Sequence, residues 1–287
     1  MSLFQPNFEA EGPGVPKDEP RKPGITRFFI LWKRKFWNIV SANMCYILFS
    51  VPAFAVNWLI GFYLICFMYQ AEAAVPEGAW LSLISFALTL TVFTGSGPAS
   101  MGMNYILRNY VREKNSWVWS DFREKWKENF KQGMLVYIVN MLVLAICLFG
   151  ILFYSVNGHS FVFTVGKWVL IFCLAIAAMM QPFINMMVVS FDMPLKKIYK
   201  NAFLLFLIKL PQNLAVFIVG SAIAIGIGML ASVYAFSAFG TLITVLIFLF
   251  MFSLPHFMWD LNAFSVMEKF MIKDDEKNEE ETEENGD

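Results

Sequence analysis

Long apolar stretches separated by short polar ones dominate the pattern along the chain. Six of them reach the roughly 20 residues that a helix needs to cross a bilayer. They cover about 38–69, 79–107, 133–155, 162–190, 212–234 and 237–260. Because lipid offers no partner for an unpaired backbone N–H or C=O, each is expected to be helical. The pattern therefore predicts an all-α fold, a polytopic membrane helical bundle of about six transmembrane helices within residues 28–272.

The two ends of the chain are polar. Residues 1–27 contain five prolines and no apolar run long enough to pack, which predicts a disordered leader. Nine carboxylates lie in residues 273–287, and their mutual repulsion predicts an extended acidic tail. We therefore expect one folded domain, the membrane domain, between two polar ends.

Two polar segments between the spans show helical periodicity and predict two cytoplasmic amphipathic helices. The first runs from Asp121 to Lys131 and the second begins at Asp192. Apolar side chains recur at helical spacing among cationic ones, and the candidate partner-binding residues among them are Trp126, Phe130, Ile198 and Phe203. The alternative, which we favour for each helix taken alone, is that these side chains rest on the lipid surface.

Composition excludes a soluble globular protein, since 58% of residues are hydrophobic and only 15% are charged. Nucleic acid is not an expected partner, because 22 basic residues balance 22 acidic ones and no basic groove is indicated. The basic residues also predict orientation. All except Lys167 lie before the first span, after the last, or in the two segments that join spans two to three and four to five. By the positive-inside rule, both termini face the cytoplasm.

The second span is interrupted by the sequence Gly-Ser-Gly-Pro. Pro98 removes an amide donor and disfavours helical geometry at Gly97, so we expect a break within the membrane. If a helix restarts there, its free amides and the face that carries Asn104 and Arg108 could line a polar cavity open to the cytoplasm. The alternative, which we favour, is a kink that only shapes packing, with Arg108 reaching the lipid headgroups.

Further polar residues lie within apolar spans. Gln181 and Asn185 stand one turn apart beside a proline, and they could bind a ligand or join helices. The candidate ligand-binding set is thus Gly97, Pro98, Asn104, Arg108, Gln181 and Asn185. His256 and Asp260 are also one turn apart, and we favour a structural role for them over a proton relay.

Small residues recur at four-residue spacing in the fifth span, at Gly220, Ala224, Gly228 and Ser232. Such a stripe lets another helix approach closely. We favour packing within the chain over homodimerisation. No catalytic motif, metal-ligand spacing or cofactor motif is present, so an enzyme is the class that we least expect, and we name no catalytic residue, metal or cofactor.

Three segments carry a family resemblance. They are TGSGPASMGMNYILRNYVR at 94–112, WSDFREKWKENFKQ at 119–132 and DMPLKKIYKNAF at 192–203. In their order and spacing, from about residue 30 to 215, they resemble the YesL-like family of uncharacterised bacterial membrane proteins. This chain departs from the family pattern at 53–94, where it carries more residues. The resemblance implies the plasma membrane of a Gram-positive bacterium and a link to ATP-driven carbohydrate uptake systems, but it supplies no active-site residue.

Together these observations predict a non-enzymatic membrane protein accessory to carbohydrate uptake, with the lipid bilayer and an ATP-driven carbohydrate permease as its partners. The alternative is a small transporter or channel with its substrate site at the broken second span. A wide polar cavity lined by Asn104, Arg108, Gln181 and Asn185 would favour the transporter. A tightly packed interior beneath an exposed cytoplasmic helix face would favour the accessory role.

Overall fold

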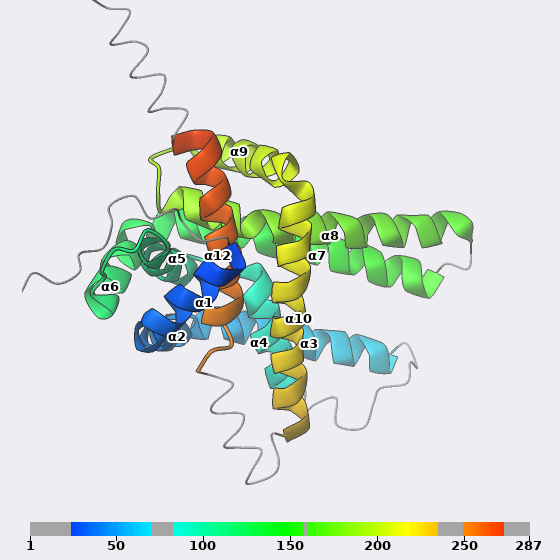
Figure 1. Ribbon diagram of the computed structural model, residues 1–287. Helices are drawn as coiled ribbons and strands as arrows, with labels where there is room; N and C mark the ends of the chain where they lie inside the picture. Colours follow the sequence, from blue (N-terminus) through cyan, green and yellow to red (C-terminus); the bar gives the residue numbers. More distant parts are fainter. Residues whose placement is uncertain (1–23, 71–82, 158–159, 235–248, 273–287) are drawn as a thin grey trace, which may run out of the picture.

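A computed structural model describes residues 24–70, 83–157, 160–234 and 249–272 (Figure 1). Every regular element within these ranges is a helix, as predicted. The elements are α1 (Gly24–Arg34), α2 (Phe36–Phe49), α3 (Val51–Gln70), α4 (Leu83–Thr94), α5 (Pro98–Val111), α6 (Val118–Glu128), α7 (Phe130–Asn157), α8 (Phe161–Val188), α9 (Leu195–Ile208), α10 (Leu210–Tyr234), α12 (Ser253–Met267) and the π-helical turn η1 (Glu268–Ile272). The predicted leader lies outside the described residues except for 24–27, which belong to α1, and the acidic tail lies outside them entirely.

The centre of the fold is formed by α5, α12 and the last third of α8. Most residues of α5 and α12 are buried, and so is every residue of α8 from Met179 to Val188 except Met180. By contrast, large apolar side chains cover the outside of the other half of α8 and of α7 and α10. The helices α7 and α8 form an antiparallel hairpin that extends away from the centre (Figure 1).

Three helices, α7, α8 and α10, are long and apolar enough to cross a membrane. The bent pair of α2 and α3 would make a fourth span if it crosses as one unit. Exposed apolar side chains on helices of this length are typical of a surface that faces lipid. The structure thus describes a membrane-embedded helical protein, but the predicted count of about six spans is not confirmed.

Two predicted spans differ in the structure from single straight helices. The first, 38–69, is divided into α2 and α3, which meet at 65°. The bend lies at Ser50, because Pro52 has no N–H to donate to the carbonyl of Leu48. The second, 79–107, consists of α4, the predicted break and α5. The first half of the sixth, 237–260, lies outside the described residues, and the second half leads into α12.

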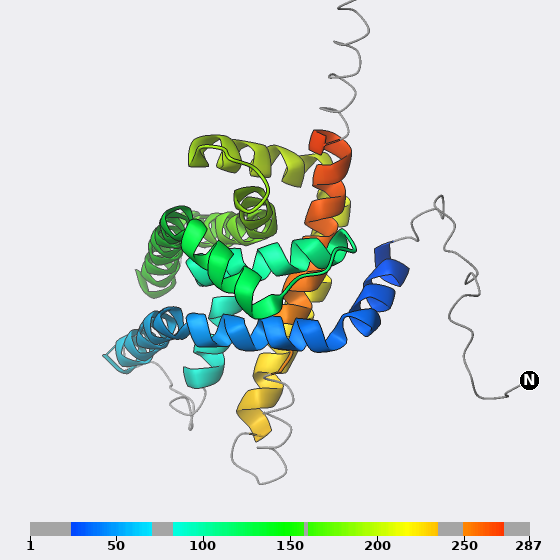
Figure 2. The ribbon, with the colours of Figure 1, turned by 90° about the vertical axis from the view of Figure 1, so that its left-hand side faces the viewer.

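The helices α10 and α12 pack side by side and run across the direction of the α7–α8 hairpin (Figures 1 and 2). The small residues of α10 make its close contacts with α12 and with α4 possible. A Cβ atom on Gly220 would lie 2.2 Å from the indole nitrogen of Trp259, and one on Gly228 would lie 2.2 Å from the hydroxyl of Thr89. Ala224 is fully buried between these positions. Packing within the chain, the favoured interpretation of this stripe, is confirmed at these three residues.

The first amphipathic helix, α6, begins three residues before the predicted Asp121. The backbone N–H of Trp117 donates to the Asp121 carboxylate at 3.0 Å, which caps the helix start. The prediction that its aromatic side chains rest on lipid is wrong for Phe122, which is fully buried against Phe49 and Gly102. The periodicity identified the apolar face correctly, but that face packs on α2 and α5.

Candidate functional site

The predicted break lies between α4 and α5. Gly95 and Gly97 both have positive φ, 72° and 60°, which residues with a side chain rarely adopt. Pro98 then occupies the first turn of α5, where its missing N–H costs nothing. The N–H of Ser96 donates to the hydroxyl of Ser100 at 2.8 Å, and the N–H of Ser100 donates to the carbonyl of Gly97. The amide of Ser100 is therefore not free, contrary to the prediction of an open helix end.

The break also frees carbonyl groups at the end of α4, and side chains from other helices bond to them. The Nδ2 of Asn140 on α7 donates to the carbonyl of Thr94 at 2.9 Å. The ring of His256 on α12 is hydrogen-bonded to the backbone of Val92. In a helix without a break, the Val92 carbonyl would accept from the N–H of Ser96. Each of these two side chains thus replaces a bond that the helix lost.

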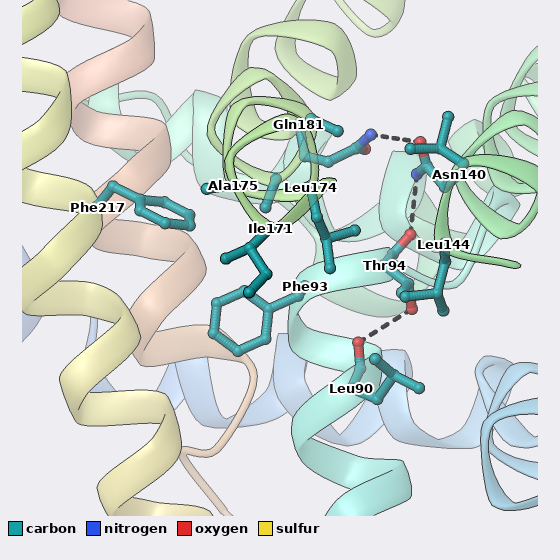
Figure 3. Close-up of a pocket in the computed structure, with 13 residues that line it drawn as sticks. Leu90, Phe93, Thr94, Asn140, Leu144, Ile171, Leu174, Ala175, Gln181 and Phe217 are labelled. Carbon is teal, nitrogen blue, oxygen red and sulfur yellow. Dashed lines mark hydrogen bonds between the residues drawn. The ribbon is translucent and has the colours of Figure 1, made fainter. Parts of the chain in front are cut away.

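A chain of amides continues from this point. The Nε2 of Gln181 on α8 donates to Oδ1 of Asn140 at 2.5 Å, so Asn140 acts as a donor to α4 and as an acceptor from α8 (Figure 3). Of this chain, the candidate set contained only Gln181. Asn140 is recognisable from the sequence as a polar residue in an apolar span, but its partners are not.

The backbones of α5 and α7 approach closely at the break. A Cβ atom on Gly97 would lie 3.1 Å from Cβ of Tyr137, and one on Gly133 would lie 2.9 Å from Cα of Pro98. Glycine is thus required on both sides of the contact. Gly97 and Pro98 shape the packing of the helices, which is the role favoured from the sequence.

A pocket of about 340 Å³ lies beside the amide chain, between α4, α7, α8 and α10 (Figure 3). Its walls are mostly apolar, with Phe93, Leu144, Leu174 and Phe217 among them. Thr94, Asn140 and Gln181 are its polar lining residues. The pocket suits a small apolar ligand or part of a lipid chain better than a charged substrate.

The structure does not assemble the polar cavity, which was the less favoured of the two interpretations of the break. Asn104 and Asn185 are buried, and of the candidate set only Gln181 borders the pocket beside the break. Arg108 points to the end of α8, where its guanidinium donates to the carbonyl of Val189 and to the hydroxyl of Ser190. The spacing of Asn104 and Arg108 placed them on one helix face correctly, but that face packs on protein.

Arg108 binds the end of α8 instead of reaching lipid headgroups as the favoured alternative proposed. Its guanidinium carbon lies 4.7 Å from the centre of the Tyr105 ring, which holds the side chain beneath the last carbonyls of α8. A cation at this position is favourable because the carboxyl end of a helix carries a partial negative charge. Arg108 thus stabilises the junction between α5 and α8.

We predict that Arg108→Ala lowers the free energy of unfolding by about 1–2 kcal/mol, because it removes charged hydrogen bonds from a partly exposed site. Unfolding of the purified protein in detergent, followed by tryptophan fluorescence, measures this change. The control is Arg112→Ala, since Arg112 is exposed one turn further along. Equal midpoints for the two variants would show that the bonds to α8 contribute nothing.

The candidate partner-binding residues divide into two groups. Phe130 and Phe203 are 41% and 43% exposed. Trp126 is half-buried, with its ring 5.0 Å from that of Phe49. Ile198 is fully buried, so the prediction that it offers an anchor to a partner is wrong. The outer face of α9 instead presents Phe203 together with Leu204, Leu207 and Ile208.

A second, polar pocket of about 480 Å³ lies where the two predicted cytoplasmic segments meet. Lys125, Asn129 and Gln132 line one side, and residues 188–192 line the other. Gln132 donates to the carbonyl of Met193 at 3.1 Å and so joins the two sides. The ammonium of Lys125 donates to the Glu128 carboxylate, which raises the pKa of Lys125 and keeps it charged.

Comparison with known protein families finds a match over part of the chain to a family of unknown function. Residues 39–151 match the model of a family described as "Protein of unknown function, DUF624". The match includes the break, Asn140 and the first amphipathic helix. No curated protein and no solved structure matches the chain. The protein is thus an apolar, helical, membrane-embedded chain with similarity to an uncharacterised family.

Proposed function

We propose that this protein is a non-enzymatic component of a bacterial plasma membrane that assists an ATP-driven carbohydrate permease. The resemblance of three segments to YesL-like proteins supports the link to carbohydrate uptake. The family whose model matches residues 39–151 likewise has no assigned activity. The apolar helices α7, α8 and α10 support the membrane location.

The proposal of an accessory role rests on how protein groups pack at the break in the second span. A permease needs a polar path to its substrate site, and the break is where such a path was expected. Protein groups occupy the break instead, because Asn140, His256 and Ser100 bond to its backbone. This tight packing favours a protein that binds another membrane protein over one that moves sugar by itself.

The surface that would contact the permease lies on α7 and α9. Phe130 and Phe203 are exposed apolar side chains at the two amphipathic segments, and the polar pocket that Lys125, Asn129, Gln132 and residues 188–192 line lies between those segments. Exposed aromatic side chains and polar groups on one surface are typical of a protein interface. The same aromatic residues could also rest on lipid, so the experiment must separate these two occupants.

The alternative function is a small transporter or channel with its site at the broken span. The observation in its favour is the pocket of about 340 Å³, which has the Asn140–Gln181 amide pair in its wall. A substrate that reached this pocket would be mostly apolar, since the other lining residues are chiefly apolar. This chemistry suits a sugar poorly.

Two measurements separate the two functions. Purified protein in liposomes should give no saturable sugar flux above that of empty liposomes. In native membranes, a photocrosslinking residue at Phe130 or Phe203 should capture a permease subunit, identified by mass spectrometry. A matched probe at Phe149, which is 73% exposed on α7 far from both segments, should capture lipid alone. Saturable flux by the protein alone would reject the accessory role.

We also propose six spans with both termini in the cytoplasm, on the basis of the basic residues. Ser120 and Ser160 are both exposed serines, at the start of α6 and just before α8. In a cysteine-free background, Ser160→Cys should react with a membrane-impermeant maleimide added to intact cells. Ser120→Cys should react only after the cells are opened. The reverse pattern would invert the proposed orientation.

A further inference from the structure

A fully buried carboxyl group without a hydrogen-bond partner lies on α12. Asp260 is completely buried, and neither of its oxygens has a partner among the described residues. It is also the only Asp, Glu, Lys or Arg that is buried in the described part of the chain. An ionised carboxylate in such surroundings is strongly unfavourable unless a positive group compensates its charge.

Two further oxygen atoms without partners lie on helices that contact α12. Oδ1 of Asn104 on α5 and Oδ1 of Asn185 on α8 are buried and accept no hydrogen bond within the described residues. The helices α5, α8 and α12 all contact one another. The Nδ2 of Asn104 already donates to the carbonyl of Ser100 at 2.7 Å, so only its oxygen remains for another group.

Hydrogen bonds near both ends of the α5–α8 contact place Asn104 and Asn185 at similar levels along the axes of these two helices. At one end, the amide chain from Gln181 reaches the break before α5. At the other, Arg108 bonds to Val189 at the end of α8. Both asparagines lie between these two sets of hydrogen bonds, on helices that pack together.

Contacts of His256 place α12 beside the same break. His256 is hydrogen-bonded to the backbone of Val92, and its ring lies 6.1 Å from that of Tyr46. The Tyr46 hydroxyl accepts from the hydroxyl of Ser96 within the break. Asp260 follows one turn after His256 on the same face of α12. Asp260 thus lies one turn along α12 from the residue that contacts the break, and α12 packs against both asparagine-bearing helices.

We propose that Asp260, Asn104 and Asn185 bind one small monovalent cation, with Na⁺ as the probe ion. Their free atoms are all oxygens, which suit a hard cation rather than a transition metal. The single carboxylate balances one positive charge, whereas a divalent ion would leave an uncompensated charge in the core. Interrupted helices within membranes provide such cation sites. This inference does not depend on the proposed accessory role.

Binding of Na⁺ to the full-length protein in detergent tests the proposal. At constant ionic strength, exchange of choline chloride for NaCl should raise the unfolding midpoint by several degrees and in a saturable way, since only the folded state binds the ion. Choline is too large for the site and supplies the reference. Equilibrium binding of ²²Na⁺ should reach about one ion per chain.

Variants connect the effect to the residues. Asp260→Asn keeps the size of the side chain but removes its charge, and it should abolish both the midpoint shift and the bound ²²Na⁺. Asn104→Ala and Asn185→Ala should each weaken Na⁺ binding at least about tenfold, which corresponds to loss of one good ligand. Asp192→Asn is the control, because Asp192 is exposed outside the core, and it should bind Na⁺ as the native protein does.

Two results would overturn the proposal. One is a midpoint that is equal in NaCl and choline chloride, together with no bound ²²Na⁺, which would show that Asp260 is simply a buried protonated acid. The other is unchanged Na⁺ binding in Asp260→Asn, which would place any ion elsewhere. Because Asp260→Asn removes a buried charge without a partner, it is expected to fold, so loss of binding can be separated from unfolding.

Discussion

Replacement of Gly97 with alanine is expected to lower the free energy of unfolding by about 2–4 kcal/mol. The backbone of Gly97 has φ 60° and ψ −121°, a region open almost only to glycine. The added methyl group would also lie 3.1 Å from Cβ of Tyr137 and 3.3 Å from the carbonyl oxygen of Gly133. Backbone strain and crowding therefore act together, and neither is relieved by rotation of a flexible side chain.

Unfolding of the purified variant in detergent, followed by tryptophan fluorescence, measures this loss. Gly226→Ala is the matched control, because a Cβ atom at Gly226 would meet nothing within 4 Å and the residue lies within a helix. Alanine there should be neutral or stabilise by up to about 1 kcal/mol. If Gly97→Ala unfolds at the same midpoint as Gly226→Ala, the break is not held in the conformation described.

The break itself could be predicted from the sequence because its cause is local. Pro98 removes a donor, and the two glycines before it permit positive φ, so the interruption needs no information from elsewhere in the chain. The small stripe of α10 was predictable for the same reason, since its spacing shows a flat face. Only the structure shows which side chains pack against this face, namely those of Trp259 and Thr89.

The partners of buried polar groups could not be predicted, because they come from distant parts of the chain. Asn140 lies 46 residues from the carbonyl that it binds, and Gln181 lies 41 residues from Asn140. Helical spacing shows which residues share a face, but it does not show whether that face meets water, lipid or protein. For this reason the sequence permits either a cavity or lipid headgroups around the face of Asn104 and Arg108, whereas the structure packs that face against other helices.

The number of membrane spans could not be predicted from hydropathy for a related reason. Hydropathy measures whether a segment is apolar, but it does not report the direction in which the helix runs. The segment 38–69 is apolar throughout and nevertheless bends by 65°, because a proline lies near its middle. Similarly, α5 was assigned to a span, yet it is buried by protein over most of its length. A buried helix and a lipid-facing helix can have similar sequences.

Replacement of Asn140 with leucine is expected to destabilise the protein by about 2–4 kcal/mol, because it leaves two polar groups without partners. The carbonyl of Thr94 would lose its donor, and the amide of Gln181 would lose its acceptor. Leucine is close to asparagine in size, so packing changes little. Leu142→Ala, on the exposed face of the same helix, provides a control that should cost less than about 1 kcal/mol.

A double-mutant cycle then separates the two bonds of Asn140. Gln181→Leu removes only the bond to Asn140 and leaves the bond to Thr94 in place, so it should cost less than Asn140→Leu. The double variant should cost about as much as Asn140→Leu alone, because no unpaired amide remains on α8, and the coupling between the two sites should be about 1–2 kcal/mol. Additive losses would show that the amide chain does not act as one unit. The helices α4, α7 and α8 would then be held together by apolar packing, and the break would not depend on this pair of side chains.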